Sequence, residues 1–92
     1  MTISKYAGVV SAEPGWRAIL TNRDGRPTIV EVQAWGLAYG SMPLLRPLDE
    51  LGQDLSARKN FVHIIDPNYP TPAMNLIITW CKEKAKKIDW IA

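Results

Sequence analysis

Cysteine and histidine are nearly absent from this chain. Cys81 is its only cysteine, so no disulfide can form within the chain, and a disulfide-stabilised secreted scaffold is excluded. His63 is its only histidine, and one His and one Cys far apart in sequence match no spacing of metal ligands. We therefore expect neither a metal nor another cofactor.

Long apolar runs and a strong charge of one sign are also missing. No stretch approaches the ~20 apolar residues that a membrane span requires, and no segment near the start has the apolar length of a signal peptide. The net charge is only +2, from 11 Lys and Arg against 9 Asp and Glu, which does not imply nucleic acid. These features favour a cytoplasmic protein.

Size and composition fit one small domain spanning residues 1–92. A hydrophobic content of 47% with four Trp is enough for an adequate core. The sequence predicts an α+β fold in which about five antiparallel strands, open or closed like a barrel, are packed by one C-terminal helix. Its parts are a sheet region over 1–66, a proline-rich connector over 67–71 and a helix over 72–90.

Turn residues mark the strands of the sheet region. A strand over 3–12 ends at Glu13-Pro14-Gly15, and Asp24-Gly25 marks a hairpin between strands 16–21 and 28–35. Alternation in the latter strand places Val30, Val32 and Ala34 on the core face, with Trp35 on the opposite one.

The rest of this region is less regular. Residues 42–47 contain two prolines and predict an edge strand or an extended connector. Residues 48–55 fit a short helix or a loop, because Gly52 weakens the helical spacing of their leucines. Residues 61–66 predict a strand that carries Phe61, His63 and Ile65 on one face.

The strongest periodicity lies in the predicted helix, where Thr71 is a favoured N-cap and Pro72 suits the first helical position. At 100° per residue the apolar residues form one arc, with Lys84 inside it and Trp90 outside it. The arc contains Ala73, Met74, Ile77, Ile78, Cys81, Ala85, Ile88, Ile91 and Ala92. Residues 72–81 are thus expected to pack on the sheet, and residues 82–92 to be available to a partner.

Candidate catalytic residues have stronger structural explanations. His63 lacks a nucleophile at a readable spacing, and Asp49, Glu50 and Asp54 fit the solvated face of a short helix better than a carboxylate pair. Cys81 lies on the apolar arc, as a core cysteine does. We therefore expect a non-enzymatic protein.

Aromatic and basic residues are the remaining functional signal. Four Trp are too many for a small sheet and one helix to bury, and exposed Trp and Tyr anchor protein interfaces. We predict that Trp35, Tyr69 and Trp90, with Lys84 and Lys87, bind a partner protein. The alternatives are weak nucleic-acid binding by the lysines of residues 82–87 near Trp80 and Trp90, and self-association near Ile88 and Ile91.

A resemblance extends over residues 3–67. It consists of Gly15-Trp16, the Asp24-Gly25 turn, Val32 to Leu37 with Trp35-Gly36, the Pro47-Leu48 step, and Asn60-Phe61-Val62 ending at Pro67. In this order the chain resembles small uncharacterised proteins of actinobacteria and their phages. The resemblance implies a phage-encoded protein that binds and redirects or inhibits a host protein.

Overall fold

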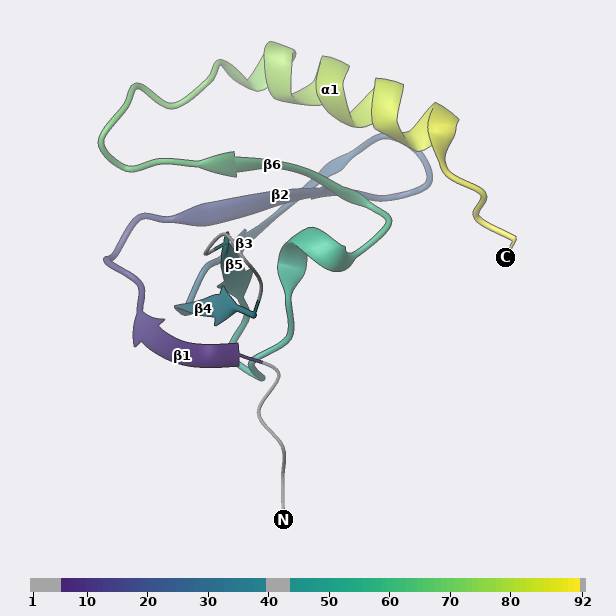
Figure 1. The fold of residues 1–92 in the computed structure, drawn as a ribbon. Coiled ribbons are helices and arrows are strands. Elements are labelled where there is room, and N and C mark those ends of the chain that lie inside the picture. Colours follow the sequence, from purple (N-terminus) through teal and green to yellow (C-terminus); the bar gives the residue numbers. More distant parts are fainter. Residues whose placement is uncertain (1–5, 40–43, 92) are drawn as a thin grey trace.

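The computed structural model describes residues 6–39 and 44–91 (Figure 1). These residues form six strands, one short 3₁₀ helix and one α-helix. In chain order the elements are β1 (Tyr6–Ser11), β2 (Arg17–Thr21), β3 (Pro27–Glu31), β4 (Ala34–Ala38), β5 (Leu44–Leu48), η1 (Leu55–Ala57), β6 (Phe61–Ile65) and α1 (Met74–Lys87).

The strands form two antiparallel sheets of three strands each, in the orders β1-β4-β5 and β3-β2-β6. Figure 1 shows α1 over one side of the β3-β2-β6 sheet and the other sheet below it. The predicted α+β class is confirmed. Two separate sheets replace the single sheet that we expected, and the strands of the described residues do not close into a barrel.

The predicted hairpin between β2 and β3 is present. The backbone N–H groups of Asp24 and Arg26 donate to the Asn22 side-chain oxygen at 3.0 and 2.8 Å. Gly25 has a φ of 80°, a conformation that glycine adopts without steric cost. The turn is therefore specified by the side chain of Asn22 as well as by Asp24-Gly25.

The prediction of one strand over 28–35 is wrong, because the chain leaves one sheet and enters the other between β3 and β4. At this break the Val32 N–H donates to the Trp16 carbonyl at 2.9 Å, and the Gln33 N–H donates to the Leu48 carbonyl at 2.8 Å. Alternation does not continue across such a change of partners. Trp35 consequently packs inward beside Val32 instead of lying opposite to it.

Strand β2 lies between two apolar clusters. On its α1 side, Ile19 packs with Ile65, Ile77 and Cys81, all 0–2% exposed. On its other side, Ala18 packs in a second cluster, which also contains Val32, Leu55, Trp16 and Trp35. Full burial of an aliphatic side chain contributes roughly 1.5–3 kcal/mol. Because β2 buries side chains in both clusters, it holds the α1 side and the second sheet together.

The helix is shorter than predicted at both ends. Ala73, with extended backbone and no side-chain hydrogen bond, is the N-cap instead of Thr71, because the proline-rich connector stays extended through Ala73. At the other end, Ile88 is extended and α1 stops at Lys87. No helix in the described part of the chain is long and apolar enough to cross a membrane.

Residues 48–55 form the end of β5, a loop and the start of η1, not a regular α-helix. Two aspartates organise this segment. Asp49 accepts the N–H groups of Leu51 and Gln53, and Asp54 caps η1 by accepting the N–H of Ser56. Residues 3–5 of the first predicted strand and residues 42–43 of the predicted edge strand lie outside the described residues.

Candidate functional site: the groove between β6 and α1

Strand β6 contributes three side chains to a groove at the edge of its sheet. Ile19 of β2 pairs with His63 and Leu20 pairs with Phe61, so Val62 is an additional residue that makes a β-bulge. Phe61 packs on the inter-sheet cluster and Ile65 on the α1 cluster, so the expectation that Phe61, His63 and Ile65 share one face is wrong. The bulge interrupts the alternation, as bulges do when they redirect side chains near binding sites.

Helix α1 contributes the opposite wall. Trp80, Lys84 and Lys87 are spaced four and three residues apart, so they lie along one face of the helix. Trp80 packs partly against the apolar cluster that buries Ile77 and Cys81. The same helical face therefore anchors α1 and forms part of the groove.

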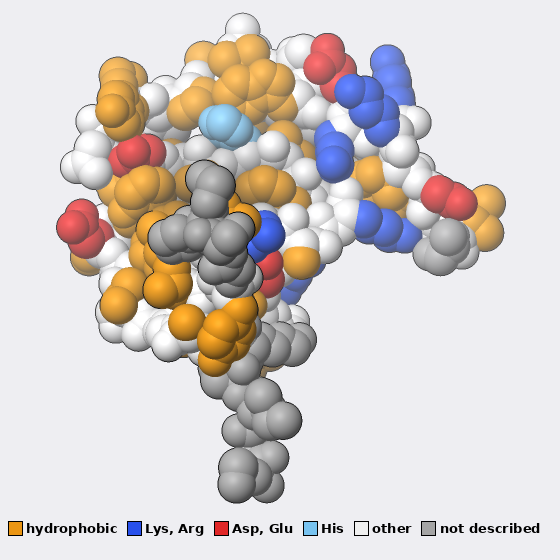
Figure 2. Space-filling model, viewed as in Figure 1, with side chains coloured by type: hydrophobic (Ala, Val, Ile, Leu, Met, Phe, Trp, Pro, Cys, Tyr) orange, Lys and Arg blue, Asp and Glu red, His pale blue; other side chains and the backbone are white. Residues whose placement is uncertain are grey.

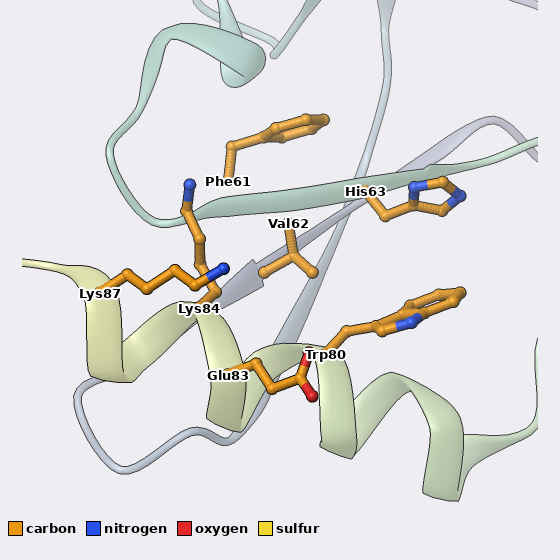
Figure 3. A pocket seen from close by; sticks show the side chains of 7 residues that line it. All are labelled: Phe61, Val62, His63, Trp80, Glu83, Lys84 and Lys87. Atoms are coloured by element: carbon orange, nitrogen blue, oxygen red, sulfur yellow. The ribbon is translucent and has the colours of Figure 1, made fainter.

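The groove has a volume of about 420 Å³. Figure 3 shows the Trp80 and His63 rings at one end, the two lysine side chains at the other and Val62 between them. The Trp80 and His63 ring centroids are 5.0 Å apart, with the ring planes at 51°. The lining residues are Phe61, Val62, His63, Trp80, Glu83, Lys84 and Lys87.

Its charge is positive and only partly balanced. Within residues 6–39 and 44–91, the salt bridges are Arg46 with Asp54 and Arg58 with Asp49, so neither groove lysine has an ion-pair partner there. Glu83 lines the same groove and leaves it with one net positive charge. Figure 2 shows cationic side chains gathered over the C-terminal half of α1.

Of the predicted partner-binding residues, the structure brings Lys84 and Lys87 together in this groove. Trp35 lies on β4, half-buried, with its ring edge-to-face with that of Trp16 at 5.1 Å. Tyr69 is 70% exposed on the connector between β6 and α1. Neither aromatic residue lines the groove.

Trp90 folds back on the end of the helix. Its indole N–H donates to the Ala85 carbonyl at 3.0 Å, and the Lys59 ammonium lies 6.0 Å from its ring centroid. The Arg23 guanidinium donates to its carbonyl at 3.4 Å. Trp90 thus packs against the C-terminal end of α1 and makes its contacts within this chain.

The candidate catalytic residues also have structural partners. Asp49 accepts a hydrogen bond from the Arg58 guanidinium at 2.8 Å, and Asp54 accepts from the Ser56 hydroxyl at 2.6 Å. Cys81 is 0% exposed, and this burial raises the pKa of its thiol, an effect that the Thr21 side chain partly offsets. Among the described residues, no three His, Cys, Asp or Glu side chains gather as metal ligands would.

Comparison with protein-family models, curated proteins and solved structures finds no match. The groove residues must therefore be judged from their own chemistry. The sequence interpretation did not assign Trp80 or His63 to a protein-binding site. The shared helical face of Trp80, Lys84 and Lys87 was a usable signal for the first, whereas the position of His63 depends on the bulge.

Proposed function

We propose that this chain is a non-enzymatic module that binds another protein through the groove between β6 and α1. The observation that carries the proposal is the juxtaposition of two lysines, without an ion-pair partner among the described residues, with the Trp80 and His63 rings in one open groove. Aromatic anchors supply contact area, and charges at the rim select and orient a complementary partner. The partner implied by the phage resemblance is a host protein.

The groove is the proposed centre of a larger contact. Its volume of about 420 Å³ is at the small end of the ~300–1,000 Å³ typical of ligand pockets, which suits a few side chains of a partner. Tyr69 is an exposed additional contact in this proposal. Trp35 and Trp90, both half-buried, would contribute through their remaining exposed edges.

The test is affinity capture with the immobilised chain, from an actinobacterial host extract, followed by a matched pair of double variants. K84E/K87E reverses the groove charge, whereas K82E/K86E makes the same change of charge on lysines that line a different hollow, beside Arg23 and Asp24. We expect a partner that is lost with the first variant and retained with the second. Equal capture by both variants would refute the proposal.

Weak nucleic-acid binding is the second candidate, favoured by the same rings beside the same lysines, because bases stack on aromatic side chains next to cations. It predicts binding of single-stranded oligonucleotides that falls steeply with salt. Self-association is a third candidate, for which Ile91, 96% exposed, provides apolar surface. A molecular mass that stays monomeric at every concentration would eliminate it.

A further inference from the structure

The groove has two chemically different ends, which define what can occupy it. We infer that its occupant is an extended acidic polypeptide segment that contains one aromatic residue and two acidic residues. The acidic residues lie two and three positions from the aromatic residue, either after it or before it. This inference rests on the proposed function and specifies the partner's chemistry. The aromatic residue would lie against Trp80 and His63, and the carboxylates would pair with Lys84 and Lys87.

The spacing follows from helix geometry. A rise of ~1.5 Å per residue places Lys84 about 6 Å and Lys87 about 10.5 Å beyond Trp80 along α1. An extended segment advances ~3.3 Å per residue, so these positions correspond to its second and third residues after the aromatic one. The second residue faces the same side as the aromatic one, and the third, which faces away, is reached by the long and flexible side chain of Lys87. The spacing of Trp80, Lys84 and Lys87 along the helix therefore matches an aromatic residue and two acidic residues within four residues of an extended peptide.

Charge favours a peptide over a polynucleotide. Glu83 lines the groove and offsets one of its two lysine charges, which leaves one net positive charge. One net positive charge neutralises few phosphates, whereas nucleic-acid affinity comes mainly from many such contacts. An acidic peptide offers separate carboxylates that two lysines can pair with, and its backbone N–H groups can donate to Glu83.

The proposed peptide does not need to add to the sheet as a strand that forms backbone hydrogen bonds with β6. β6 is an edge strand of its sheet, but the bulge at Val62 disrupts the regular ladder that an added strand requires. The same bulge places Val62 against the α1 cluster, and His63 lies beside Trp80. Side chains of the groove, not its edge, are therefore the recognition elements.

The direct test uses fluorescein-labelled peptides with the cores Trp-Ser-Asp-Glu and Glu-Asp-Ser-Trp, one for each direction, titrated with the full chain by fluorescence anisotropy. At least one should bind, and K84E/K87E should weaken it about tenfold or more, while K82E/K86E changes its affinity less than about twofold. A Trp-Ser-Asn-Gln core and a core with six serines between Trp and the acids should both bind weakly.

His63→Ala provides a second readout, because His63 is exposed and its removal should leave the fold intact. It should weaken the Trp peptide but not the matching Ala-Ser-Asp-Glu peptide. Labelled oligothymidylate is the competing probe. Tighter binding of the oligothymidylate, with displacement of the peptide, would assign the groove to nucleic acid and overturn the inference.

The experiments distinguish a failure of the inferred peptide pattern from a failure of the proposed protein-binding function. If a captured protein depends on Lys84 and Lys87 but neither peptide direction binds, the inferred pattern is wrong and the proposed function stands. If no captured protein depends on these lysines, the proposed function itself is wrong. Peptide binding that is indifferent to both lysine variants would also overturn the inference.

Discussion

Gly25 in the β2–β3 hairpin lies directly against Lys82 of α1. A Cβ added to Gly25 would lie 2.8 Å from Cγ and 3.0 Å from Cα of Lys82 on α1. Gly25 also has a φ of 80°. Conformation and contact therefore both require glycine there, whereas Gly52, with a φ of 77°, has no neighbouring atom within 4 Å of such a Cβ.

This pair of glycines yields a controlled comparison. Gly52→Ala should lower the free energy of unfolding by about 1–2 kcal/mol, the cost of a left-handed alanine. Gly25→Ala should lower it by about 1–3 kcal/mol more, because α1 must move away from the hairpin. Urea denaturation of both variants measures the difference, and equal losses would show that the hairpin does not press on α1.

Cys81 makes a prediction about alkaline pH. Burial raises the pKa of its thiol above the ordinary 9.0, so the folded chain keeps its proton where the unfolded chain loses it. Stability is therefore full below about pH 9 and falls as the pH rises, by at most ~1.4 kcal/mol per pH unit. The measurement is urea denaturation of the wild type and Cys81→Ala from pH 7 to 10.5. The alkaline decline should be smaller in the variant, and parallel curves would contradict the prediction.

At the scale of elements, the helix was predictable as an amphipathic segment, and the hairpin was predictable from Asp24-Gly25, because both signals are local. The change of sheet at Val32 and Gln33 was not, because it depends on hydrogen bonds to Trp16 and Leu48, far away in the sequence. The candidate site divides in the same way. Its lysines were found from local charge, but the contact of His63 with Trp80 requires the pairing of β6 with β2.

The segment that follows α1 gives a prediction at this scale. Trp90→Ala removes the hydrogen bond to the Ala85 carbonyl and the ring that lies beside Lys59, so we expect a loss of about 1–3 kcal/mol in unfolding free energy. Ile91→Ala, at a 96% exposed position, is the control and should change stability by less than about 0.5 kcal/mol. Thermal or urea denaturation distinguishes the two, and similar small effects would mean that Trp90 does not hold the end of α1.

For the molecule as a whole, stability is distributed unevenly between the two sheets. Four of the five β2 residues are buried, whereas five of the six β1 residues are exposed. Val9 and Val10 of β1 and Leu44 and Leu45 of β5 are all more than half exposed. The β1-β4-β5 sheet therefore has the smaller share of the core and should open first.

Amide hydrogen exchange can measure this order. The hydrogen-bonded amides of β2 should exchange only by global unfolding, and those of β1 should exchange faster through local opening, because local stability follows burial. Residue-resolved exchange by NMR at neutral pH is the measurement. Equal protection of β1 and β2 would indicate that the two sheets unfold as one unit.

The burial of β2 on both faces also restricts how this sequence can change in evolution. Ile19 faces one cluster and Ala18 the other, so a slip of one position would exchange a large and a small side chain between two filled spaces. Homologues are thus expected to accept insertions in the loop before η1 or in the proline-rich connector, and to keep the length of β2 invariant.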